Sequence, residues 1–97
     1  MADKSPQIEK ILGPHVSITL SGTVYSPPLP AGGANFILVQ ALAQNIRYTL
    51  NGLTPTAAIG FRLTSGNDPI LIEMFGDVTP QFFRETSGAI LEYEWYE

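Results

Sequence analysis

The sequence has no cysteine and a single histidine, and this scarcity removes two common kinds of site. Without thiols there can be no disulfide and no thiolate-bound metal, which fits synthesis in a reducing cytoplasm. His15 directly follows Gly13-Pro14, and we interpret it as a loop residue without an acid nearby. Zinc and iron sites use several His or Cys ligands, and nucleophilic catalysis needs an oriented base. We therefore predict no enzymatic activity, no metal site and no cofactor.

Charged residues are also scarce, at 14% of 97 residues, whereas about a quarter is usual in globular proteins. The net charge is -4 and the five basic residues are scattered, so the chain should repel a phosphate backbone. No apolar run approaches the roughly 18 residues of a membrane span, and the first residues lack the apolar core of a secretory signal. Neither nucleic acid nor a membrane is an expected partner. A hydrophobic content of 44% favours a protein interface, although a compact sandwich with short loops would also explain it.

Short apolar runs separated by glycine and proline are what the sequence does contain. Seven runs have the length and composition of strands, at residues 16–25, 36–43, 46–50, 61–64, 70–75, 81–85 and 89–96. We predict one all-β domain over residues 15–97, an antiparallel β-sandwich or jelly-roll-like barrel of about seven or eight short strands. Residues 1–14 form an N-terminal arm or a short helical turn that stops at Gly13-Pro14.

Three segments allow more detailed predictions. Residues 16–25 alternate apolar and polar side chains, as a half-buried strand does, whereas residues 36–43 are apolar on both faces and indicate a central strand. Gln44-Asn45 predicts a tight hairpin into residues 46–50. The next turn, Asn51-Gly52, suits type I′, in which both central residues have positive φ.

We expect partner contacts from residues that the predicted strands do not place in the core. The aromatic side chains could also pack in the core or stack on a sugar ring, although outside the core we favour protein contact, and the proline-rich segment could be an ordinary loop. The candidates come from the arm, the proline-rich segment, two arginines and the last strand: Ile8, Ile11, Leu12, Pro27, Pro28, Leu29, Pro30, Arg47, Arg62, Tyr93, Trp95 and Tyr96.

A motif in the middle third of the chain carries a resemblance. It comprises residues 47–52, Thr54-Pro55-Thr56, residues 60–63, Gly66 and Pro69-Ile70. Here the chain resembles a group of small tailed-bacteriophage virion proteins that includes head decoration, or cement, proteins. The resemblance implies a β-rich homo-oligomer, with a trimer favoured, that bridges major capsid protein subunits on the capsid surface after synthesis in the host cytoplasm. A head–tail connector or tail protein is an alternative.

The same residues are similar to a second group, the accessory β-sandwich modules of chitobiases and related secreted glycosidases. Those modules carry the pattern Tyr-Thr-x-Asp-Gly-x-x-Pro-Thr, in which Asn51 replaces the aspartate here. This resemblance implies a monomer that binds carbohydrate on a platform of exposed tyrosine or tryptophan. Because the modules belong to exported enzymes and this chain starts at Met1 without an export signal, we prefer the virion interpretation.

Overall fold

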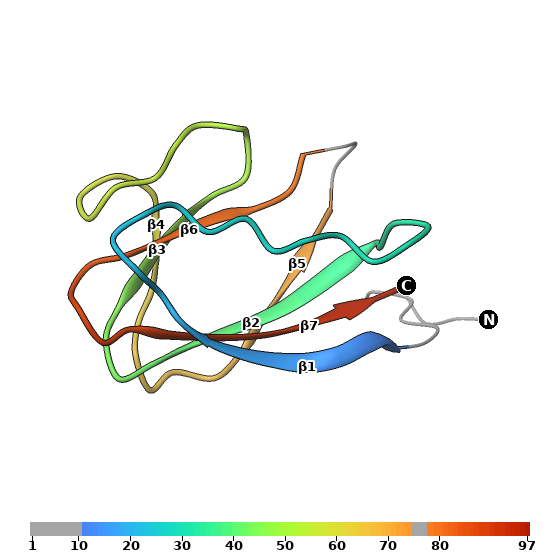
Figure 1. Cartoon of the computed structure of the whole chain (residues 1–97), viewed down its shortest axis with the longest axis horizontal. Helices are drawn as coiled ribbons and strands as arrows, with labels where there is room; N and C mark the ends of the chain where they lie inside the picture. The colour runs from blue at the N-terminus through green and yellow to red at the C-terminus, as the bar shows by residue number, and fades with distance from the viewer. Residues whose placement is uncertain (1–10, 75–77) are drawn as a thin grey trace.

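Two antiparallel sheets contain the regular structure of residues 11–74 and 78–97, the residues described in this computed structural model (Figure 1). The strands are β1 (Ile11–Thr19), β2 (Phe36–Leu42), β3 (Ile46–Thr49), β4 (Phe61–Leu63), β5 (Ile70–Glu73), β6 (Gln81–Arg84) and β7 (Ile90–Tyr96). One sheet has the order β1-β7-β2-β5 and the other β4-β3-β6. The predicted all-β sandwich is confirmed, and the described residues include no helix. Ile8 and most of the predicted arm or helical turn lie outside them.

The core lies between the sheets and follows the alternation of the strands. In β7 the side chains of Leu91, Tyr93 and Trp95 point inward and are buried, while the residues between them are half-buried. Phe82 and Ile46 supply buried side chains from the second sheet. Because successive side chains of a strand point to opposite faces, this pattern fixes which face of each strand is buried.

The first strand begins and ends earlier than the sequence predicted. Instead of residues 16–25, β1 covers Ile11–Thr19 and so includes Gly13, Pro14 and His15. Its last backbone contact is from Leu20 N to Ala89 O, at 2.9 Å, after which the chain crosses to the other sheet. There Tyr25 pairs with Phe82, through hydrogen bonds of 2.8 and 2.9 Å. The segment predicted as one strand thus pairs with both sheets, which the alternation of its side chains does not reveal.

The predicted hairpin at Gln44-Asn45 is wrong because β2 and β3 belong to different sheets. Gln44 N donates to Leu42 O at 2.8 Å around Ala43, whose φ is 69°. This is a three-residue γ-turn, and it redirects the chain from one layer to the other. The central position of β2 is confirmed, since it pairs with both β5 and β7. Its outward face is only partly covered: Leu38, Gln40 and Leu42 are half-buried.

The predicted type I′ turn at Asn51-Gly52 is also wrong. Ala43 is the one non-glycine residue with positive φ in the described part of the chain, so Asn51 lacks the required conformation. Asn51 instead accepts a hydrogen bond on Oδ1 from Leu53 N, at 3.1 Å. This local side-chain bond is typical of an Asx turn. The segment is therefore a wide connection to β4, which pairs with β3 from residue 61 onward.

Candidate functional site

The structure brings five of the predicted contact residues together around one pocket of about 230 Å³. We call it the proline–aromatic pocket. Its lining comes from β1, the proline-rich segment and β7: Leu12, Gly13, Pro14, Val16, Pro28, Pro30, Tyr93 and Trp95. Leu29, which lies between two of the lining prolines, is an exposed large hydrophobic residue. Ile11 is also exposed, but it pairs with Tyr96 and so lies on the opposite face of β1 from Leu12. Whether the lining residues contact a partner stays a prediction.

Tight turns hold the proline-rich wall of this pocket in place. Gly33 N donates to Pro30 O at 2.9 Å, and Gly32 has a φ of 84°. A positive φ at the third position of a four-residue turn is typical of type II, which favours glycine there. Pro27 is fully buried and anchors the start of the segment, leaving Pro28 and Leu29 exposed. The loop thus exposes Pro28 and Leu29 between a buried proline and a hydrogen-bonded turn.

The aromatic residues of the pocket are mostly buried. Tyr93 and Trp95 are 3% and 5% exposed, and their rings meet edge to face with centroids 6.2 Å apart. Tyr25 Oη and Tyr93 Oη share a hydrogen bond of 2.8 Å. Burial and this contact raise the pKa of Tyr93 well above its usual range. The two β7 rings therefore form a floor rather than an exposed platform. Tyr96 lies on the opposite face of β7, where its hydroxyl donates to Glu94.

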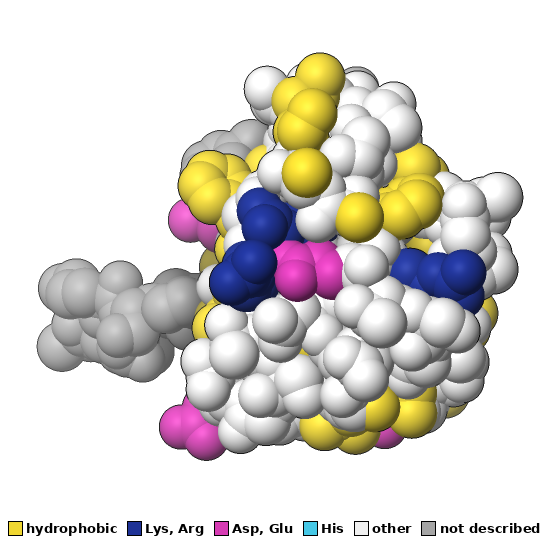
Figure 2. Space-filling view, turned by 90° about the vertical axis from the view of Figure 1, so that its left-hand side faces the viewer, with side chains coloured by type: hydrophobic (Ala, Val, Ile, Leu, Met, Phe, Trp, Pro, Cys, Tyr) yellow, Lys and Arg dark blue, Asp and Glu magenta, His cyan; other side chains and the backbone are white. Residues whose placement is uncertain are grey.

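The two predicted arginines lie away from this pocket and share one acid, Glu85. Arg47 Nε and Arg62 Nε both donate to Glu85 Oε2, the latter at 2.8 Å, and Arg47 Nη1 donates to Gly60 O at 3.0 Å. Desolvation raises the pKa of Glu85, but the hydrogen bonds from Arg62 and Arg47 outweigh it, so this pKa lies below its ordinary value. Figure 2 shows an acidic side chain among basic ones, beside hydrophobic side chains. Arg62 is the more exposed arginine of the pair.

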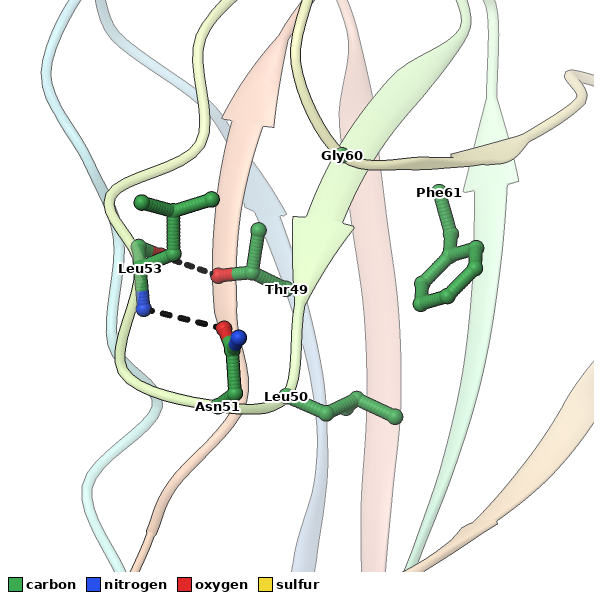
Figure 3. A pocket seen from close by; sticks show the side chains of 6 residues that line it. All are labelled: Thr49, Leu50, Asn51, Leu53, Gly60 and Phe61. Carbon is green, nitrogen blue, oxygen red and sulfur yellow. Dashed lines mark hydrogen bonds between the residues drawn. The ribbon is translucent and has the colours of Figure 1, made fainter.

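A second apolar pocket, which the sequence analysis missed, lies at the end of β3. We call it the Phe61 pocket; its volume is about 390 Å³ and it is lined by Thr49, Leu50, Asn51, Leu53, Gly60 and Phe61 (Figure 3). Phe61 is 64% exposed, and Leu53 and Ile59 are also exposed. The sequence does contain a signal for this pocket: Leu53 and Ile59 are large apolar residues in a turn-rich loop. No strand alternation assigns them to a buried face.

The motif residues build the loop that carries this pocket. Thr49 Oγ1 donates to Leu53 O, and Figure 3 shows this bond beside the one from Leu53 to Asn51. Farther along, Thr56 and Ile59 form paired backbone bonds of 3.0 and 3.2 Å around a short reversal. Pro55 is fully buried. The central part of the segment that carries the resemblance is therefore the loop between β3 and β4.

His15 differs from its predicted setting. It lies in β1 rather than in a loop, and two acids of β7 face it: Nε2 is 2.8 Å from Glu92 Oε1 and Nδ1 is 2.8 Å from Glu94 Oε2. The sequence analysis did not place Glu92 and Glu94 near His15, because they are 77 and 79 positions away in the chain. Pairing between the first and last strands brings them together.

The described residues can also be compared with the requirements of a metal site and of a membrane span. Within residues 11–74 and 78–97 no group of three or more His, Cys, Asp or Glu side chains could hold a metal ion. Nor does that part of the chain contain a helix long and apolar enough to cross a membrane. Comparison of the chain with protein-family models, curated protein sequences and solved structures found no match.

Proposed function

We propose that this chain is a structural protein of a tailed-bacteriophage virion, of the head decoration or cement type, and that it bridges neighbouring major capsid protein subunits. The observation that carries the proposal is the presence of two separate apolar surfaces on one small domain. They are the proline–aromatic pocket with Leu29, and the Phe61 pocket with Leu53 and Ile59.

The positions of these surfaces suit a bridging role. In Figure 1 the start of β1 and the 30–33 turn lie toward one end of the domain, and the loop between β3 and β4 lies toward the other. A protein that ties two subunits together needs a contact surface for each. Large exposed apolar side chains that gather around a pocket are typical of protein contacts, because burying them releases ordered water.

The motif supports the same proposal. Several of the residues that carry the resemblance, including Thr49, Asn51 and Gly60, line the Phe61 pocket, and Thr49 and Asn51 both bond to Leu53 in its loop. The resemblance thus falls on the part of the molecule that presents exposed apolar side chains. On this proposal the chain forms homo-oligomers, with a trimer favoured, on the outer surface of the capsid.

The carbohydrate-binding alternative has less support. Such a module would stack a sugar on exposed tyrosine or tryptophan rings, but the lone tryptophan, Trp95, is buried beside Tyr93. The most exposed aromatic ring among the described residues is Phe61, which has no hydroxyl or indole N–H to bind a sugar hydroxyl. No observation favours a tail or connector position over the head.

Quantitative mass spectrometry of purified virions, from the phage whose genome encodes this chain, tests the proposal. We expect the chain to co-purify with the particles through a density gradient, at a fixed ratio to the major capsid protein. Its absence from intact particles, or retention of the isolated monomer on chitin or another polysaccharide, would contradict the proposal.

A further inference from the structure

The N-terminal half of β1 is joined to β7 by an interrupted ladder. Leu12 pairs with Trp95 and Val16 pairs with Tyr93, so that residues 13–15 together stand opposite the single residue Glu94. Gly13 has a φ of 82°, and Pro14 has no N–H to donate. Such a bulge weakens the backbone pairing locally and redirects the side chains on it. Other contacts must therefore help to hold this half of the strand.

His15 supplies those contacts. Its imidazole lies between Glu92 Oε1 and Glu94 Oε2, at 2.8 Å from each, and each carboxylate faces a different ring nitrogen. A neutral imidazole has one N–H and one lone pair, whereas the imidazolium has two N–H groups. Only the protonated ring can donate to both carboxylates. We call the arrangement of His15, Glu92 and Glu94 the His15 bridge.

Of the groups in the His15 bridge, His15 is the one whose pKa is closest to neutral pH. Glu92 is also bonded to Ser17, and Glu94 accepts a bond from the Tyr96 hydroxyl. The strand β2 and the turn before β5 contribute Leu38, Gln40 and Pro69, which do not titrate. The hydrogen bonds with Glu92 and then Glu94 raise the pKa of His15 above its ordinary value of 6.5. Bonds with Tyr96 and His15 lower the pKa of Glu94, and bonds with His15 and Ser17 lower that of Glu92.

The bulge that carries His15 is also a wall of the proline–aromatic pocket. Leu12, Gly13, Pro14 and Val16 all line that pocket, and Leu12 lies opposite Trp95 in the ladder. His15 projects to the outer face of the sheet, whereas Leu12 packs against the core. The His15 bridge and the pocket wall therefore belong to the same stretch of backbone, on opposite faces of β1.

We propose that the His15 bridge is a proton-dependent fastening of the N-terminal half of β1, and that losing the proton releases this segment and opens the proline–aromatic pocket. The imidazolium holds residues 12–15 against β7 through both carboxylates. After deprotonation, one carboxylate faces a lone pair on the ring and the two acids repel each other across adjacent positions of the face. The pocket wall then separates from Trp95 more often.

The direction of the pH dependence follows from the pKa changes. Because folding raises the pKa of His15, its contribution is complete below pH 6.5 and is lost as the pH rises through the folded-state value. Because folding lowers the pKa of Glu92 and Glu94, their contribution is complete above pH 4.5 and is lost as the pH falls through their folded-state values. The segment should be held most firmly between these limits.

Acrylamide quenching of Trp95, the lone tryptophan, between pH 5.5 and 9 tests this proposal on the isolated full chain. We expect the quenching constant to rise with pH, with a midpoint that matches the titration of the His15 ring followed by NMR and lies above 6.5. The fraction of molecules in which residues 12–15 have separated from β7 should grow by about tenfold for each pKa unit by which folding raises the pKa of His15. Because no partner is added, the result does not depend on the proposed virion role.

Two variants complete the experiment. His15→Gln keeps a hydrogen-bonding side chain but cannot gain a proton, so its quenching should not change with pH. Glu94→Gln should move the His15 midpoint toward its ordinary value. A flat quenching profile in the wild-type chain, an equal rise in His15→Gln, or a His15 titration at or below 6.5 would each overturn the proposal. The NMR titration of the wild-type chain keeps the test valid even if a variant does not fold.

Discussion

At the scale of single residues, the inward-facing aromatic of β6 is central to the core. Phe82 is fully buried, and it lies beside Tyr48 with ring centroids 6.0 Å apart. Its backbone also bonds to Tyr25, so this residue joins the crossing segment to the second sheet. The neighbouring Phe83 points the other way and is half-buried. Burial rather than aromatic character should therefore decide the effect of a substitution.

We predict that Phe82→Ala lowers the free energy of unfolding by about 3 to 5 kcal/mol, because it removes apolar contacts and leaves a cavity. Phe83→Ala is the matched control and should cost clearly less. Urea unfolding followed by Trp95 fluorescence measures both variants. Equal losses in the two would show that the core is not centred on Phe82.

Among the glycines that the structure describes, Gly60 leaves the least room for a side chain. Its φ is 126°, and a Cβ placed there would lie 2.9 Å from Tyr48 O. Gly52 also has a positive φ, of 86°, but a Cβ there would meet nothing within 4 Å. Gly52→Ala should therefore cost only about 1 to 2 kcal/mol of conformational strain. We predict a larger loss for Gly60→Ala in the same urea titration, and a loss no larger than that of Gly52→Ala would contradict the close approach.

At the scale of elements, the alternation of side chains predicted the strands much better than their connections. The inward positions of β7 and the central place of β2 follow from local pattern, because each face of a strand has a single environment. The crossing at residues 20–25 and the γ-turn at Ala43 could not be predicted, since a short turn does not reveal which sheet receives the next strand. The convergence of Leu12 and Pro28 on Trp95 depends on those crossings, as does the pairing of His15 with Glu92 and Glu94.

The shared acid of the second sheet connects three of its elements. Arg47 belongs to β3, Arg62 to β4, and Glu85 directly follows β6. We predict that Glu85→Gln lowers the free energy of unfolding at pH 7 by about 1 kcal/mol, as for a partly exposed ion pair. Because folding lowers the pKa of Glu85, its contribution is present above pH 4.5 and disappears as the pH falls through the folded-state value.

Urea titrations of the wild-type chain and Glu85→Gln at pH 7 and at acid pH measure this difference. Their free energies of unfolding should converge at low pH. A gap that persists undiminished in acid would mean that Glu85 stabilises the sheet by packing rather than by its charge.

At the scale of the whole molecule, the proposed virion role requires that the two apolar surfaces bind partners and contribute little to folding. Leu29 and Phe61 are both exposed, one on each surface. We predict that Leu29→Asp changes the free energy of unfolding by no more than about 0.5 kcal/mol. Phe61→Asp also removes the contact with the Tyr48 ring, whose centroid lies 5.6 Å from that of Phe61, and should cost about 1 kcal/mol. Each should weaken binding to particles by more than about fivefold, which corresponds to roughly 1 kcal/mol.

The matched controls are Ser26→Asp and Thr54→Asp, which place the same charge at exposed polar positions in the proline-rich segment and in the loop before β4. They should bind particles like the wild-type chain. Comparable losses in the controls would point to a general effect of negative charge instead of a specific apolar contact. Size-exclusion chromatography with light scattering on each variant should show whether oligomer formation uses either surface.

The most direct test of the proposed bridging role is an electron-microscopy map of virions from the phage whose genome encodes this chain. The account predicts density for the β-sandwich on the capsid surface, with the proline–aromatic pocket against one neighbouring subunit and the Phe61 pocket against another. A map in which the sandwich is absent from the particle, or in which both pockets face solvent, would contradict it.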